Sequence, residues 1–155
     1  MNSQLLRAQE LSEAVWIRLL RAHTAVTREL STRLENGHGL TLSDFDVLVQ
    51  LFHAEGHRLR RIDLARSVLL TASGITRLLD GLERAGWVAK ERCASDARVT
   101  YAVLTAAGLE KVVAARASHR TDVEELFGSQ FSPDEKATLD ELLARLPLAD
   151  TTCQQ

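Results

Sequence analysis

The chain has 155 residues, of which 45% are hydrophobic and 26% are charged, and its formal net charge is −2. These values are typical of one folded domain and exclude a disordered or fibrous chain. No stretch approaches the roughly 18 uninterrupted apolar residues of a membrane span, and the first residues lack the basic cluster that starts a signal peptide. We therefore expect a cytoplasmic protein without a membrane partner, whose two cysteines are reduced thiols.

The first predicted element is a long helix over about residues 5–34. Its apolar stripe consists of Leu11, Val15, Leu19, Val26, Leu30 and Leu34, with Trp16, Leu20 and His23 beside it. A helix of this length measures roughly 38 Å at 1.5 Å per residue, which is more than one small domain can cover. Its remaining apolar surface therefore needs a further partner.

The second predicted helix follows a turn that the two glycines of Asn36–Gly39 indicate. Ser43 followed by Asp46 is typical of an N-cap with an acid at N3, and Gly56 is expected to end the helix. Its predicted buried residues are Phe45, Leu48, Val49 and Phe52. The two phenylalanines are most simply core residues.

Two further helices and a hairpin are predicted from there to residue 104. The shorter helix carries Ile62, Leu64, Ala65, Val68 and Leu69, and the longer one carries Ile75, Leu78, Leu79 and Leu82 on one face. Thr71 is the expected N-cap of the longer helix, and Gly86 is expected to end it. Residues 87–92 and 99–104 are β-branched or aromatic segments around a polar loop, which is typical of a β-hairpin. Helix, tight turn, helix and hairpin form a winged helix-turn-helix.

Two helices are predicted after the hairpin, with Thr105 and Ser132 as their N-caps; Pro133 and Glu135 strengthen the second signal. Because both ends of the chain carry surplus apolar faces, we expect a homodimer. The predicted fold class is mainly α with a small β-hairpin wing. Residues 1–40 and 106–150 would form the helical dimerisation region, residues 41–105 the winged helix-turn-helix, and residues 151–155 a disordered tail.

The charges are unevenly distributed along the chain. Residues 58–98 contain nine Lys or Arg against five acids, whereas the rest holds ten basic and sixteen acidic residues. A basic module on an acidic body is expected of a protein that binds DNA. The predicted function is that of a sequence-specific regulator that binds a palindromic operator in double-stranded DNA and represses a nearby promoter, with activation as the alternative.

The candidate DNA contacts lie on the longer helix and the hairpin. The N-terminal half of that helix offers Thr71, Ser73, Gly74, Thr76 and Arg77, while Arg61 and Arg66 are candidate phosphate contacts. Arg98 at the wing tip could enter the minor groove, and Asp96 could hold an arginine in place by a charge-assisted hydrogen bond.

Two motifs resemble those of one family of regulators. The pattern Asp96-x-Arg98-x5-Leu104-Thr105-x2-Gly108, preceded by Leu82-Glu83-x-x-Gly86, is similar to the wing signature of the multiple-antibiotic-resistance regulator (MarR) family. Thr76-Arg77-Leu78-Leu79-Asp80-x-Leu82 is similar to that family's recognition helix. The resemblance implies an obligate dimer, a DNA-contacting role for the Asp96–Arg98 pair, and release from DNA by a small, often aromatic and anionic, ligand.

The resemblance places the ligand in a crevice between the dimer helices and the winged module. Candidate ligand-binding residues are Trp16, His23, Phe45, Phe52, Lys90 and Arg92. Packing in the core or at an interface is the alternative role for Trp16, and phosphate contact is the alternative for Lys90 and Arg92.

Other functions remain open at this point. Cys93 lies beside Arg92, so a thiol-responsive regulator is one alternative, and a winged module that binds protein instead of DNA is another. We expect no enzyme, because the sequence has no phosphate-binding Gly-rich loop and no Ser/His/Asp arrangement in an identifying context. We also expect no cofactor and no metal site, since His53 and His57 have no companion ligands at suitable spacing.

Overall fold

A computed structural model describes residues 2–67, 72–93, 96 and 98–146, and for residues 2–6, 72 and 73 it describes the backbone alone. Thr71, Val68, Leu69 and the tail at 151–155 lie outside the described residues. The helices are α1 (Asn2–His38), α2 (Leu42–His53), α3 (Arg61–Ser67), α4 (Ala72–Arg84), α5 (Ala106–Leu126) and α6 (Pro133–Leu143), with short 3-10 turns at Glu55–His57 and Gly128–Gln130. The strands are β1 (Arg58–Arg60), β2 (Val88–Arg92) and β3 (Thr100–Leu104).

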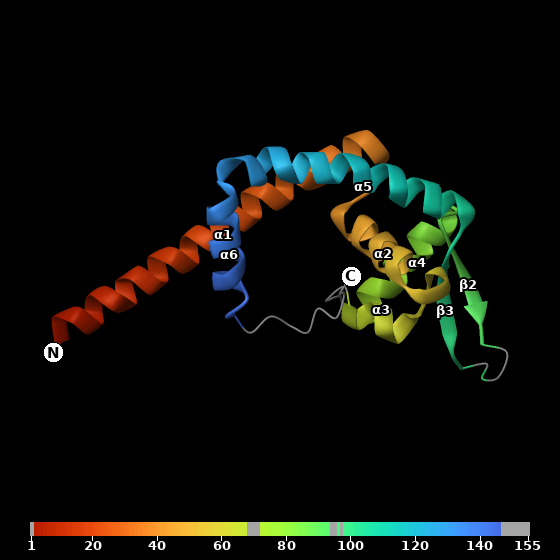
Figure 1. Cartoon of the computed structure of the whole chain (residues 1–155). Helices are drawn as coiled ribbons and strands as arrows, with labels where there is room; N and C mark the ends of the chain where they lie inside the picture. The colour runs from red at the N-terminus through yellow and green to blue at the C-terminus, as the bar shows by residue number, and fades with distance from the viewer. Residues whose placement is uncertain (1, 68–71, 94–95, 97, 147–155) are drawn as a thin grey trace.

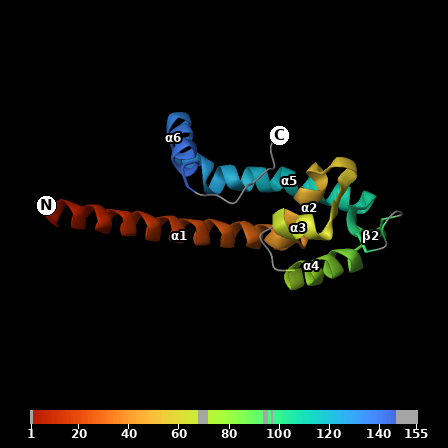
Figure 2. The same cartoon turned by 90° about the horizontal axis from the view of Figure 1, so that it is seen from below.

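The elements form a winged module beneath two long helices. Figure 1 shows α2, α3, α4 and the strands gathered at one end, with α5 running above them and the N-terminal part of α1 projecting away. The view from below in Figure 2 shows α6 beside the middle of α1, far from the hairpin. The mainly helical fold with a small wing agrees with the fold class expected from the sequence.

The sheet is antiparallel and has the strand order β1-β3-β2. The hairpin strands pair from Val88 opposite Leu104 to Arg92 opposite Thr100. The sequence did not predict β1, because its three residues carry a single apolar side chain and are too few to show an alternating pattern.

The boundaries of the first two helices differ from the prediction. Helix α1 continues through Gly37 to His38 and ends at Gly39, whose φ of +64° favours glycine. The N-cap of α2 is Thr41, so the predicted Ser43 cap is wrong: Thr41 Oγ1 accepts a hydrogen bond from Asp44 N, and the Asp44 side chain accepts one from Thr41 N. Helix α2 ends at His53 and not at Gly56.

The core lies where α2, α4, α5 and the sheet meet. Its fully buried large side chains are Leu34, Leu40, Val47, Leu48, Leu51, Leu64, Leu79, Leu82 and Val112. Phe45 belongs to this core and Phe52 packs partly buried against it, as the simpler reading of both residues predicted.

The wing is joined to α5 by tight contacts. Thr105 is the N-cap of α5, as predicted, and its hydroxyl accepts a hydrogen bond from Gly108 N while donating one to Gly86 O at 2.7 Å. Thr105 N donates to Trp87 O at 3.1 Å. The start of α5 is therefore fixed directly on the base of the hairpin.

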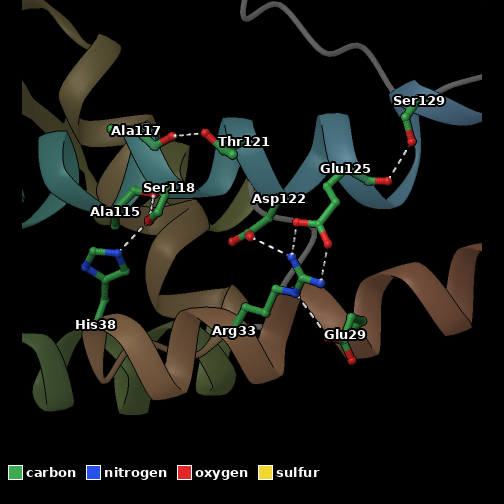
Figure 3. A network of polar contacts seen from close by, with 10 residues as sticks. All are labelled: Glu29, Arg33, His38, Ala115, Ala117, Ser118, Thr121, Asp122, Glu125 and Ser129. Atoms are coloured by element: carbon green, nitrogen blue, oxygen red, sulfur yellow. Dashed lines mark hydrogen bonds and ion pairs between the residues drawn. The ribbon is translucent and has the colours of Figure 1, made fainter.

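A polar cluster fastens α1 to α5 (Figure 3). Arg33 of α1 donates hydrogen bonds to Asp122 at 2.8 Å and to Glu125 at 2.9 and 3.2 Å on α5, and to Glu29 at 3.1 Å. These carboxylates raise the pKa of Arg33 above its ordinary value. His38 also contacts Ser118 at 2.6 Å, so polar contacts link the two helices at two levels.

Candidate nucleic-acid interface

Helix α4 presents its polar face to solvent because its apolar face is buried. Ile75, Leu79 and Leu82 are between 1% and 3% exposed, and this face packs on the core. The opposite face carries Arg77, which is exposed. Gly74 is partly buried and lies in the first turn of α4 beside Ser73, whose side chain is not described. The N-terminal half of α4 can therefore face a partner without disturbing the core.

Thr76 and Arg61 contact each other, although both were predicted as DNA contacts. The Arg61 guanidinium, at the start of α3, donates a hydrogen bond to Thr76 Oγ1. Both side chains are partly buried. This hydrogen bond links the two helices of the helix-turn-helix, so Arg61 helps to orient α4 whatever else it contacts.

Lys90 forms ion pairs with two acidic side chains of α4. Its Nζ lies 2.7 Å from Asp80 Oδ1 and 2.7 Å from Glu83 Oε2. The hydrogen bond from Lys90 lowers the pKa of Asp80, and the two carboxylates raise the pKa of Lys90. Lys90 therefore ties β2 to α4, an arrangement that the sequence reading did not predict.

The wing exposes its arginine as the sequence predicted. The side chain of Arg98 is 92% exposed. Asp96 Oδ1 accepts hydrogen bonds from Arg98 N at 3.0 Å and from Arg98 Nε at 3.3 Å. Asp96 thus holds the first part of the Arg98 side chain and leaves the end of the guanidinium pointing outward.

The other arginines of the winged module differ in their exposure and in their contacts. Arg66 and Arg92 are exposed. Arg58, by contrast, lies over the Tyr101 ring at 4.2 Å and 3.7 Å from Glu91, and Arg60 lies 3.5 Å from Asp63. The thiol-bearing Cys93 is half-buried at the end of β2, where its backbone N–H donates to Val99 O.

The structure does not bring the six predicted ligand-binding residues together. Trp16 and His23 are exposed on α1. Phe52 lies under the Arg116 guanidinium at 4.4 Å, whereas Lys90 contacts α4 and Arg92 is on the hairpin. The expected single crevice is therefore not formed within one chain, because α1 extends away from the winged module instead of covering it.

Phe45 does line a pocket, together with residues that sequence reasoning missed. The pocket lies between α2 and α5, has a volume of about 390 Å³, and is lined by Leu42, Ser43, Phe45, Asp46, Val49 and His119. The Phe45 and His119 rings are 4.7 Å apart. Only the crossing of α2 and α5 brings Asp46 and His119 to one place, so no local pattern could have found the pair.

Burial changes the acid–base properties of Asp46 and His119, the two titratable residues that line this pocket. Desolvation lowers the pKa of His119 and raises that of Asp46, although Gln50 partly offsets the latter by a hydrogen bond. Both shifts favour the neutral form. Among the described residues, His119 Nδ1 is a buried atom without a hydrogen-bond partner. The lining of the pocket is thus largely apolar.

None of the described helices combines the length and the apolarity that a bilayer-spanning segment requires.

The MarR family model matches residues 40–100 of the chain. The HTH-type transcriptional repressor YetL of Bacillus subtilis is 32% identical over 110 residues, which cover 71% of this chain and 65% of that protein.

Solved structures extend the similarity beyond the winged module. AbsC, a MarR family transcriptional regulator from Streptomyces coelicolor, is 32% identical with a TM-score of 0.79, covering 84% of this chain and 88% of that one. Sco3205 from the same organism, solved in complex with DNA, is 28% identical with a TM-score of 0.80, covering 85% and 86%. These proteins are transcriptional regulators and not enzymes, in line with the prediction from sequence.

Proposed function

The chain belongs to the MarR family of DNA-binding transcriptional regulators, and we propose that it acts as a homodimer that represses a promoter by occupying a palindromic operator. The observation that carries this proposal is the exposed Arg98, held by Asp96 beside a recognition helix whose polar face is open. Repression is favoured over activation because YetL, a relative with 32% identity, is a repressor by name.

The dimer is supported by the apolar surface of α1. Four large apolar side chains in the N-terminal half of α1 are between 44% and 66% exposed, namely Leu11, Val15, Trp16 and Leu20. Contiguous apolar surface of this kind is characteristic of a protein interface. A second copy is the proposed partner, because a two-fold axis would let the α1 helices of both copies cover one another and would place two winged modules on one duplex.

The dimer is tested with one acidic substitution on each of two faces of α1. Val15→Asp should weaken association, since Val15 is 56% exposed on the apolar stripe. Arg21→Asp is the control, because six residues at 100° each place its carboxylate 240° round the helix from Val15, on an exposed face that carries none of Leu11, Trp16 and Leu20. Sedimentation at micromolar concentration should give a dimer for the wild type and the control, and a shift to monomer for Val15→Asp. A monomeric wild type would contradict the proposal.

DNA binding is supported by the geometry of two elements that can reach neighbouring grooves. The N-terminal half of α4, with Ser73, Gly74, Thr76 and Arg77, would enter the major groove, and Arg98 would enter the adjacent minor groove. Thr71, Arg61 and Arg66 are further proposed contacts. The negative potential of a narrow minor groove attracts a guanidinium, which explains why a nearly fully exposed arginine would be placed at the wing tip.

The test uses a duplex that the wild-type protein selects from a random-sequence library. Arg98→Ala should weaken binding at least tenfold and reduce the dependence of log Kd on log salt by about two counterions, one for each winged module of the dimer. Arg84→Ala removes the same charge from the C-terminal end of α4 and should bind almost as the wild type does. Circular dichroism checks that both variants fold. Failure of the wild type to enrich any duplex would contradict the DNA-binding function itself.

A small-molecule effector is supported by the pocket between α2 and α5. Its volume of about 390 Å³ lies within the range of ligand pockets in proteins. The Phe45 and His119 rings suit an aromatic compound, and Asp46 disfavours an anion. We therefore narrow the expected class of effector, aromatic or anionic, to a neutral aromatic molecule.

The effector class is tested with substituted phenols and the matching benzoates. The phenols should raise the thermal midpoint and release the selected duplex, and the benzoates should do so less because of Asp46. Val49→Phe, which fills the pocket, should abolish the response without affecting DNA binding. Equal responses of Val49→Phe and the wild type would exclude this pocket.

A further inference from the structure

Lys90 lies on the face of β2 that turns toward the recognition helix. In the hairpin Val88 pairs with Leu104 and Lys90 pairs with Ala102, and all of these except Lys90 are buried. Since alternate residues of a strand share a face, Lys90 continues the inward face one step beyond Val88. Its side chain is 33% exposed, and its Nζ lies 2.7 Å from each of two carboxylates.

The two carboxylates lie on one flank of α4. Asp80 and Glu83 are three residues apart and Thr76 is four residues before Asp80, so the three side chains are neighbours along the helix. Thr76 is held by Arg61 from α3, while Asp80 and Glu83 are held by Lys90 from β2. The same flank of the recognition helix is therefore attached to the preceding helix and to the wing.

The ion pairs of Lys90 contact the part of β2 that lies beyond the buried core. Val88, at the base of β2, is 2% exposed, but the residues beyond it are partly or fully exposed. The five residues from Val88 to Arg92 span about 13 Å, at about 3.3 Å for each of the four steps between them. A swing of about ten degrees at the base would thus displace the outer end of the strand by about 2 Å, which is enough to misplace a minor-groove contact.

We propose that Lys90 is a positioning residue for DNA binding, which sets the angle between the wing and α4 through Asp80 and Glu83. The inference rests on the proposed function, because DNA binding requires the helix and Arg98 to reach their grooves together. Lys90 makes no phosphate contact itself: two carboxylates already neutralise it, and the group of three side chains carries a net negative charge.

A phosphate contact and a positioning role differ in their dependence on salt. Each phosphate contact that is lost reduces the slope of log Kd against log salt by about one counterion, whereas a loss of preorganisation weakens binding at all salt concentrations alike. Lys90→Met should therefore weaken binding to the duplex selected by the wild type about five- to tenfold without changing the slope. Lys90→Arg should restore most of the affinity, and Arg98→Ala is the matched control that does change the slope.

A double-mutant cycle tests whether Lys90 acts through its partners. In an Asp80→Asn, Glu83→Gln background, Lys90→Met should cause no further loss of affinity, because the contacts that it removes are already absent. Circular dichroism and the thermal midpoint check the fold of each variant. Should Lys90→Met fail to fold, Glu83→Gln alone takes its place, with a smaller loss of affinity and an unchanged slope as the expected result.

Several results would overturn the inference. A slope reduced by about two in Lys90→Met, one for each winged module of the dimer, would make Lys90 a phosphate contact. An equal effect in both backgrounds would mean that Lys90 acts independently of Asp80 and Glu83. If Lys90→Met, or its substitute Glu83→Gln, bound the duplex with the affinity of the wild type, the ion pairs would have no role in DNA binding. In all these cases the wild type still binds its selected duplex, so the failure is distinguishable from failure of the proposed function.

Discussion

Replacement of Gly108 by alanine should push α5 away from the hairpin. An added Cβ at this position would lie 2.0 Å from Trp87 O, 2.9 Å from Trp87 C and 2.9 Å from Leu104 Cδ1. Two of these three atoms belong to the backbone, which cannot move aside as a side chain can. The same Trp87 O accepts the hydrogen bond from Thr105 N, so relief of the clash would disturb the attachment of the helix.

The expected loss of stability combines three contributions. Overpacking against a rigid neighbour costs up to about 3 kcal/mol, and the strained hydrogen bond adds about 1 kcal/mol. Alanine in place of glycine within a helix regains about 1 kcal/mol. Gly108→Ala should therefore lower the free energy of unfolding by about 3 kcal/mol at most, and by at least about 1 kcal/mol if the first turn of α5 relaxes.

Gly81→Ala is the matched control for this substitution. Gly81 also lies within a helix, α4, but a Cβ there would meet no atom within 4 Å. This variant should gain about 0.5–1 kcal/mol from helix propensity. Urea unfolding followed by circular dichroism compares the two variants at equal protein concentration, because the stability of the proposed dimer would depend on concentration. If Gly108→Ala proved as stable as Gly81→Ala, the close approach of α5 to the hairpin would be refuted.

Three further predictions concern the helix ends and the polar clusters. Thr41→Ala should lower the free energy of unfolding by about 1 kcal/mol in chemical denaturation, whereas Ser43→Ala should change it by less than about 0.5 kcal/mol. A larger loss for Ser43→Ala than for Thr41→Ala would indicate that Ser43 is the N-cap, as expected from the sequence. Arg33→Met should lower the thermal midpoint more than Arg28→Met does, because it leaves three carboxylates without their shared cation. The difference in thermal midpoint between Arg33→Met and Arg28→Met should decrease as the pH falls below about 4.5, because Arg33 lowers the folded-state pKa of Glu125 and the resulting stability is lost when Glu125 is protonated. A difference that does not depend on pH would contradict this role of Arg33. Burial lowers the pKa of His119 below 6.5 in the folded state, so on acidification the unfolded chain binds the proton first. Lowering the pH from about 7.5 to 5.5 should therefore reduce the thermal midpoint of the wild type more than that of His119→Gln. Equal reductions in the two proteins would argue against the burial of His119.

The parts of the fold that the sequence predicted correctly depend on local patterns. The apolar spacing of Ile75, Leu79 and Leu82 defines the buried face of α4 within a few turns of one helix. The caps at Thr105 and Ser132 were correct because a capping hydrogen bond spans only three residues. The cap of α2 was misplaced because Thr41–Asp44 and Ser43–Asp46 have the same spacing, and only the backbone conformation decides between them.

The candidate site was predictable to the same local extent. Asp96 was expected to hold an arginine, either Arg98 or one on the recognition helix, and the structure pairs it with Arg98, two residues away. The partners of Lys90 were not expected, because strand and helix must pack before one acid is nearer than another. His119 was missed entirely, since 73 residues separate it from Asp46 and the spacing within either helix carries no information about the other.

The arrangement of α5 gives the proposed effector a direct route to the wing. One wall of the pocket is α5, which contributes His119, and the other wall is α2. The N-terminus of the same helix is fixed to the hairpin through Thr105 and Gly108, and its C-terminal half is fastened to α1 through Arg33. A rigid helix held at both ends transmits a displacement along its length. Within the proposed mechanism, a ligand that separates α2 from α5 would therefore move the base of the wing relative to α4, and the Lys90 ion pairs would have to stretch or break.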